Sequence, residues 1–350
     1  MDSLPNSQRA LKARGPKQVE IHEECSLPVL EADEILVRVR CVGINPVDVK
    51  MLDMAPHVGA TIGCEFAGDI VKVGTSVKNS QLKVGVAVFG CVCGNNPNRP
   101  DNGAFADYVA VAGGLVYLLP PHLSYQHGAT LGAALPTVGM ALYQKWHLAP
   151  PLPPSAIGTP ENPEVNRYVL VYGGSTACGA MALQMIRKSG LVPALGAQEA
   201  FDYHSPSCGD DIRCYTADAL AYVFDCITDI SSMRICYAAM GRAGGKYMGL
   251  NPIPVRAHTR RDIKPDYILV YTMFGKEVSW PRPFARPARR KDRAFAESWY
   301  QATQTLVDTP GEIHPHPLEQ GPDNLQGVIK GLDRMRKGDV SGVKLVYDLI

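Results

Sequence analysis

The chain has 350 residues, of which 46% are hydrophobic and 20% charged, a composition typical of a globular protein with enough core for two domains. Its formal net charge of +1 argues against general nucleic-acid binding. The polar start MDSLPNSQRALKARG contains no signal-peptide core, and no run reaches the roughly 18 apolar residues of a membrane span. Ten cysteines without paired spacing favour reduced thiols in a cytoplasmic protein, which we expect to be a monomer.

Short β-rich segments alternate with glycine turns at residues 34–114, which predicts a small, mostly antiparallel barrel. The proline-rich stretch 150–166 predicts a surface loop. Strand and helix then alternate up to residue 275, which predicts a doubly wound parallel sheet. Its strand candidates are residues 168–172, 200–203, 221–226, 246–250 and 267–274. A helix and the strand VKLVYDL follow residue 295, and we expect this strand to rejoin the barrel.

Residues 168–180, YVLVYGGSTACGA, predict a buried strand, a glycine turn and a helix whose backbone amides bind the pyrophosphate of a dinucleotide. The backbone can turn sharply and approach phosphate at Gly173 and Gly174, and Ser175 and Thr176 supply hydroxyls for the helix cap. The G-x-G-x-x-G fingerprint is incomplete, because Ser175 and Cys178 stand at its third and last positions. A glycine pair that opens an ordinary helix is therefore the alternative.

A barrel domain with a nucleotide-binding domain inserted before its last strand resembles the layout of medium-chain dehydrogenases and reductases. Residues 45–50 (NPVDVK) resemble the INPxDxK segment of the quinone-reductase branch. Residues 63–68 (GCEFAG) stand where zinc alcohol dehydrogenases carry GHExxG, and residues 101–108 (DNGAFADY) resemble a GxxAEY-like strand. The resemblance implies a GroES-like catalytic domain at 1–138 and 276–350, and a Rossmann cofactor-binding domain at 139–275.

Seven further segments, in order, resemble the trans-acting enoyl reductases of fungal polyketide synthases, a family that includes the lovastatin enoyl reductase. They are LVYGGSTACGAMALQMIRKSG, FDYHSP, DCIT, GRAGGKYMGLNP, TMFG, SWPRPFARP and MRKGDVSGVKLV. The resemblance implies NADPH-dependent reduction of the α,β-double bond of a polyketide chain. The chain would be held on the acyl carrier domain of a polyketide synthase or of a synthase–peptide synthetase hybrid. A free-standing quinone or enone reductase and a cofactor-impaired docking partner of a synthase are the alternatives.

A zinc site of this layout needs Cys, His and a further Cys or carboxylate around one ion. Asn45 stands at the first ligand position and Cys64 at the second, beside Glu65, and no four-cysteine lobe follows. We therefore expect no metal.

An enoyl thioester is already electrophilic at its β-carbon, so the site needs to hold the nicotinamide, stabilise enolate charge and exclude water. The resemblance implies that Lys50, assigned as the catalytic residue, contacts the nicotinamide ribose or its phosphate; the alternative is a solvated loop lysine. For Tyr203, the alternative to an adenine contact is a core tyrosine. The implied cofactor contacts are Val47, Asp48, Val49, Lys50, Gly173, Gly174, Ser175, Thr176, Ala177, Cys178, Tyr203, Leu250, Asn251, Val343 and Lys344. The implied substrate contacts are Ala134, Leu135, Pro136, Thr137, Val138, Gly139, Met140, Thr272, Met273, Phe274, Gly275 and Lys276.

The predicted Rossmann unit is short in one place. Only residues 195–199 separate the strand candidates 191–194 and 200–203, whereas a crossover between parallel neighbours needs about a dozen residues. The chain thus lacks the family segment that binds the adenosine 2′-phosphate, so the NADPH assignment rests on resemblance. A shortened gene product and a tolerated loss are the two interpretations.

Six cations lie within residues 282–293, beside the predicted substrate segment 272–276. They are Arg282, Arg286, Arg289, Arg290, Lys291 and Arg293. They form either a solvated surface or a basic rim that attracts an acidic carrier domain.

Overall fold

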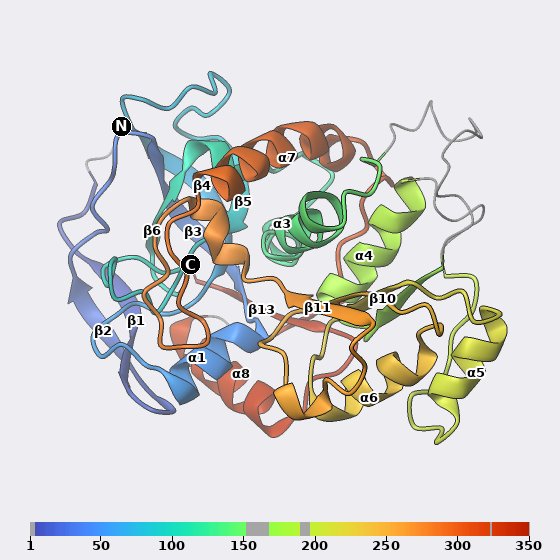
Figure 1. The fold of residues 1–350 in the computed structure, drawn as a ribbon. Helices are drawn as coiled ribbons and strands as arrows, with labels where there is room; N and C mark the ends of the chain where they lie inside the picture. Colours follow the sequence, from blue (N-terminus) through green and yellow to red (C-terminus); the bar gives the residue numbers. More distant parts are fainter. Residues whose placement is uncertain (1–3, 152–167, 190–196, 323, 350) are drawn as a thin grey trace. The chain divides into compact units, whose positions relative to one another are not determined.

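A computed structural model describes residues 4–151, 168–189, 197–322 and 324–349 (Figure 1). The chain divides into two compact units, one formed by Met1–Pro136 with Tyr271–Ile350 and the other by Thr137–Val270. Most of the predicted proline-rich loop and the strand candidate 191–194 lie outside the described residues. No helix in the described part of the chain is long and apolar enough to cross a membrane.

The first unit is built on a mostly antiparallel sheet with the strand order β12-β13-β3-β4-β5-β7, in which β6 also pairs with β3. These strands are β3 (Glu34–Gly43), β4 (Glu65–Val73), β5 (Ala87–Cys91), β6 (Tyr108–Ala112), β7 (Val116–Leu118), β12 (Leu318–Gln320) and β13 (Lys344–Asp348). A separate hairpin joins β1 (Gln8–Gly15) to β2 (Gln18–Cys25). The antiparallel architecture predicted from the alternating segments is confirmed.

The last strand returns to the sheet of the first unit, as predicted. β13 pairs antiparallel with β3, with Val346 opposite Gly43. Because β3 is long, it also pairs with β4 and β6, and its valines and isoleucine are buried. The helices that accompany this sheet are α1 (Pro46–Met54), α2 (Tyr125–Gly128), α7 (Arg290–Asp308) and α8 (Leu325–Lys337), with short 3₁₀ turns at η1 (Gly113–Leu115) and η5 (Val270–Phe274).

The second unit contains a parallel sheet with the order β11-β10-β9-β8. Its strands are β8 (Val169–Tyr172), β9 (Tyr222–Asp225), β10 (Gly245–Gly249) and β11 (Ile263–Tyr267). Its helices are α4 (Ala177–Lys188), α5 (Cys208–Tyr215), α6 (Ile230–Ala239) and the 3₁₀ turn η4 (Val255–Ala257). Helix α4 contacts β8, and α6 contacts β8 and β9; Figure 1 shows α4 and α6 on opposite sides of the strands. The helix α3 (Ala134–Val138) continues into a π-helix, η2 (Gly139–Lys145).

Two predicted strands are wrong. Residues 200–203 form no strand, because Asp202 caps a turn by accepting the His204 N–H at 2.9 Å, and β8 pairs with β9 alone among the described strands. The strand predicted at 267–274 ends at Tyr267 in β11, and the apolar run that follows forms η5. A short buried apolar run has the same composition in a strand and in a helical turn, so its pattern could not separate the two.

Candidate active site

The glycine turn between β8 and α4 has the geometry of a phosphate-binding element. Gly173 has a φ of +77°, in the left-handed region that glycine adopts without strain. Thr176 caps α4, since its Oγ1 accepts the Gly179 N–H at 3.1 Å and donates to the Gly173 carbonyl at 2.8 Å. A helix that begins in this way presents N–H groups and the positive end of its dipole to an anion. The predicted residues from Gly173 to Cys178 thus lie in one continuous turn and helix start.

Gly179 is the glycine that the sequence analysis missed. A Cβ at this position would lie 2.2 Å from the Gly173 carbonyl oxygen and 2.9 Å from the Gly174 Cα, so only glycine lets α4 pack against the turn. A Cβ at Gly174 would meet its nearest neighbour, Leu183 Cδ1, at an ordinary 3.5 Å. Counting the fingerprint from Gly174 puts Gly179 at the last position, whose glycine serves close helix–strand packing.

A second turn, directly after β9, is organised by Asp225, which the sequence analysis also missed. The Asp225 side chain is fully buried and accepts the N–H groups of Ile227 and Thr228, each at 2.9 Å. It also accepts the hydroxyls of Ser232 and Tyr247, each at 2.6 Å. Four hydrogen bonds to one carboxylate hold this turn in a single conformation.

The Asp225 turn fixes the predicted cofactor residues that follow β10. Thr228 Oγ1 accepts the Leu250 N–H at 2.8 Å, and Asn251 donates its amide to the Ile227 carbonyl at 2.9 Å. A Cβ at Gly173 would lie 3.3 Å from Ile227 Cγ1, so the glycine turn adjoins the same segment. The carboxyl ends of β8, β9 and β10 therefore meet at one edge of the sheet, where doubly wound folds bind their ligands.

Tyr203 lies beside this edge. Its ring stands edge-on to that of Tyr172, the last residue of β8, at 6.1 Å between centroids, and lies 4.0 Å from the ring of His204. The side chain is 57% exposed, so the alternative of a core tyrosine is wrong. Its ring offers an aromatic surface next to the glycine turn.

The first unit carries the predicted residues Val47, Asp48, Val49 and Lys50 on α1. The turn before this helix is closed by two hydrogen bonds, from the Asn45 N–H to Asp48 Oδ2 at 2.8 Å and from the Asp48 N–H to the Asn45 carbonyl at 3.0 Å. Asp48 is buried, and burial raises its pKa to about 7 despite the opposing effect of the Asn45 N–H. Lys50 is exposed on the same helix.

The buried ion pair Glu65–Lys344 includes one of the positions that were considered as zinc ligands. Glu65 is fully buried, and its Oε2 accepts the Lys344 ammonium and, at 2.8 Å, the amide of Asn45. Burial raises the pKa of the Cys64 thiol well above its usual value, and this thiol donates to Asp48 Oδ2 at 3.6 Å. Zinc needs thiolates and carboxylates that are open to coordination. The Glu65 carboxylate does not fit zinc, because it is already bound to the Lys344 ammonium and the Asn45 amide.

The described ranges contain no cluster of three His, Cys, Asp or Glu residues arranged for a metal ion. The predicted cofactor residue Val343 is half-buried, and Lys344, which follows it, directs its ammonium to Glu65.

The predicted substrate residues occupy two segments. Those from Ala134 to Met140 are buried on α3 and at the start of the π-helix, an element that is often found at functional sites. In the second segment Thr272 and Met273 are buried, Phe274 and Gly275 are half-buried, and Lys276 is exposed.

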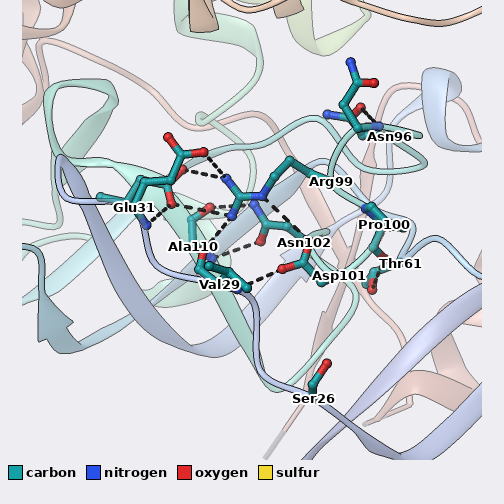
Figure 2. Close-up of polar contacts among 12 residues, drawn as sticks. Ser26, Val29, Glu31, Thr61, Asn96, Arg99, Pro100, Asp101, Asn102 and Ala110 are labelled. Carbon is teal, nitrogen blue, oxygen red and sulfur yellow. Dashed lines mark hydrogen bonds and ion pairs between the residues drawn. The ribbon is translucent and has the colours of Figure 1, made fainter.

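Figure 2 shows a polar cluster around Arg99 in the first unit, and Lys276 joins this cluster through Glu31. Arg99 donates to Glu31 Oε1 at 3.0 Å and to the Val29 carbonyl at 2.8 Å. Asp101 accepts the Val29 N–H at 2.8 Å, and Glu31 also accepts the Lys276 ammonium at 2.5 Å. The Arg99 cluster thereby holds the end of the second substrate segment against the loop before β3.

Comparison with known proteins identifies relatives along the whole chain. Residues 31–121 match the alcohol dehydrogenase GroES-like domain. The chain is 44% identical over 363 residues to the trans-enoyl reductase opdC of Penicillium oxalicum, with 100% of this chain and 99% of that protein covered. It is 43% identical over 345 residues to the trans-enoyl reductase apdC of Emericella nidulans, with 99% and 98% covered.

Solved structures share the fold. The crystal structure of CurK enoyl reductase matches with a TM-score of 0.69 at 16% identity, covering 98% of this chain and 100% of that one. A putative zinc-dependent alcohol dehydrogenase from Rhizobium etli matches with a TM-score of 0.74 at 19% identity, covering 99% of both. Identities this low establish the fold alone, whereas the full-length matches above 40% establish the family. The chain belongs to the trans-enoyl reductases, a family of oxidoreductases.

Proposed function

We propose that this protein uses NADPH to reduce the α,β-double bond of an enoyl thioester held on the acyl carrier domain of a fungal polyketide synthase. The carrier domain belongs either to such a synthase or to a synthase–peptide synthetase hybrid. The observation that carries it is full-length similarity to trans-enoyl reductases, combined with the glycine turn that opens α4 in the second unit.

The residues of the second unit support a nicotinamide dinucleotide. The N–H groups at the start of α4 would hold the pyrophosphate, as helix starts do for phosphate in general. Tyr203 would cover the adenine, while Leu250 and Asn251, fixed by the Asp225 turn, would face the nicotinamide end. In the first unit Lys50 would contact the ribose or its phosphate. Because the Lys344 ammonium is bound to Glu65, a contact at Val343 and Lys344 would come from their backbone.

The chemistry requires little from the protein beyond positioning. When bound, NADPH supplies the hydride, and the thioester carbonyl already makes the β-carbon electrophilic. The chain has to orient the two reactants, exclude water and stabilise negative charge on the enolate oxygen. The segment from Ala134 to Met140 is buried and mostly apolar, and it would supply a wall of the substrate site.

The arginine-rich segment 282–293 is the feature that favours a carrier-bound substrate over a free one. A Cβ at Gly275 would lie 2.9 Å from Arg293 Cβ, so this segment packs directly against the second substrate segment. Arg293 is paired with Glu297 at 2.7 Å, whereas Arg289, Arg290 and Lys291 are exposed. Exposed cations at this place would speed encounter with an acidic carrier domain and orient its phosphopantetheine phosphate.

The proposal is tested with an enoyl chain loaded on a carrier domain. We expect loss of NADPH absorbance and a product heavier by two hydrogens in the mass spectrum of the carrier. Changing both Arg289 and Arg290 to Glu should slow this turnover, most at low ionic strength, and leave a small free thioester unaffected. Arg242→Glu, at an exposed arginine of the second unit, is the matched control. Reduction of free quinones with no reduction of carrier-bound chains would contradict the proposal.

A cofactor-impaired docking partner is the second candidate, and β8 favours it. All four residues of this strand are half-buried, and in the described part of the sheet it has one neighbour. The alignment with opdC spans 363 positions, more than the 350 residues of this chain, so part of that relative has no counterpart here. The alignment with apdC, in contrast, spans 345 positions over 99% of this chain and leaves almost no gap in this chain. That comparison does not favour the docking partner. An NADPH fluorescence titration separates the two candidates, because the docking partner would bind the cofactor weakly or not at all.

A further inference from the structure

The buried pair Glu65–Lys344 joins two strands that are far apart in the sequence. Glu65 begins β4 and Lys344 begins β13, and both strands pair with β3 near Gly43. The two side chains are 0% and 4% exposed. A Cβ at Gly43 would lie 2.2 Å from the Ala129 carbonyl oxygen and 3.0 Å from Lys344 Cε, so the Ala129 backbone leaves room for glycine only, next to the lysine stem.

The Glu65 carboxylate divides its two oxygens between different segments. Oε2 accepts the Lys344 ammonium and the Asn45 amide, while Oε1 accepts the Ala133 N–H at 2.8 Å. Lys344 donates in addition to Asn45 Oδ1 at 2.6 Å. Asn45 in turn closes the α1 turn through its N–H bond to Asp48.

This network contacts three segments of the first unit. Two of them carry the expected cofactor residues, and the third begins the first stretch of expected substrate residues. Asn45 directly precedes the α1 residues that end at Lys50, Ala133 directly precedes α3, and Lys344 itself follows Val343. A metal ion in a related layout would gather ligands from separate segments in a comparable way. Here an ammonium and a carboxylate hold the segments together.

We infer that Glu65 and Lys344 are positioning residues, which set the α1 turn and the start of α3 for cofactor and substrate through Asn45 and Ala133. A buried ion pair is weak evidence for stability, because a well-packed apolar pair of similar volume is often as stable. Its hydrogen bonds to two further segments give it a different role, since they fix where those segments lie. The inference rests on the proposed function where it is tested by kcat/KM. Its structural part is tested by backbone hydrogen exchange, which does not depend on the proposed function.

The test compares single and double variants of the pair. Glu65→Gln leaves the Lys344 ammonium buried without a counter-charge, so the Tm should fall by roughly 5–15 °C. The double variant Glu65→Gln with Lys344→Met removes both charges, so its Tm should return most of the way to that of the parent. If the pair positions the segments, kcat/KM of the double variant should stay roughly tenfold or more below the parent. Hydrogen exchange of residues 45–50 and 133–138 should also stay faster.

Recovery of Tm, kcat/KM and exchange together in the double variant would overturn the inference and leave the pair a packing feature. If the double variant fails to fold, Glu65→Asp replaces it: the charge is kept, but the shorter side chain cannot reach both Lys344 and the Ala133 N–H. An unchanged kcat/KM in Glu65→Asp would equally overturn the inference.

The matched control is the ion pair Arg9–Asp107, which lies in the same unit at 2.8 Å and joins β1 to the residue before β6. The double variant Arg9→Met with Asp107→Asn should lower the Tm without changing kcat/KM or the exchange of residues 45–50. If the parent protein reduces no enoyl chain, the proposed function fails, yet the exchange measurement still decides whether the pair orders the two segments.

Discussion

Replacing Gly179 with alanine should push α4 away from the glycine turn and weaken cofactor binding. The added Cβ would stand 2.2 Å from the Gly173 carbonyl oxygen, whereas ordinary contacts begin near 3.4 Å, so backbone has to move by about an ångström. Overpacking of this kind costs about 1–3 kcal/mol, which lowers the Tm by roughly 2–10 °C. Loss of one hydrogen bond to the pyrophosphate costs about 1.5–3 kcal/mol, so the Kd for NADPH should rise roughly 10- to 100-fold.

Gly174 is the matched position for this measurement. A Cβ there would meet Leu183 Cδ1 at 3.5 Å and the Val171 carbonyl at 3.9 Å, so the protein itself accepts a side chain. Gly174→Ala should keep the parent Tm, and Gly174→Val should abolish NADPH binding through the ligand alone while the first unit stays folded. Thermal unfolding by circular dichroism and NADPH fluorescence titration give the two quantities for each variant. A parent-like Kd in both Gly179→Ala and Gly174→Val would show that the pyrophosphate binds elsewhere.

Three further predictions concern pH, metal and chain length. Burial raises the pKa of Asp48 to about 7, so this carboxyl holds its proton more tightly in the folded chain. Its contribution to stability is complete below about pH 4 and is lost as the pH rises to about 7; Asp48→Asn should flatten this decline, and an unchanged pH slope of Tm would refute the assignment. Chelators should leave activity unchanged, and metal analysis that finds about one tightly held zinc per chain would overturn this expectation. Inserting a crossover segment of the family type after Pro193 should raise NADPH affinity, discrimination against NADH and the Tm, because it would cover the side of β8 that has no neighbour among the described strands. Unchanged values would mean that the short form is a complete fold.

Local patterns were sufficient for most of the architecture. The apolar alternation of β3 and β4, the apolar run of β8 and the glycines after it are properties of neighbouring residues, so they could be interpreted without knowing what packs against them. The burial predicted for β8 was not found, because all four of its residues are half-buried. The same holds for the cap of α4, which depends on residues three positions apart. The two incorrect strands were those whose outcome depended on a partner strand: residues 200–203 pair with no strand among the described residues, and residues 270–274 form a largely buried 3₁₀ turn.

The polar interior was decided by the tertiary structure. Glu65 and Lys344 are 279 positions apart, and neither carries a local signal of being buried or paired. Asp225 likewise could not be told from a surface carboxylate until Tyr247 on β10 and Ser232 on α6 were brought against it. Residue type determines which groups are able to bond, and short-range periodicity determines the element that carries them. Which buried charge meets which partner depends on strand pairing and on the closure of long loops, and these exist only in the folded chain.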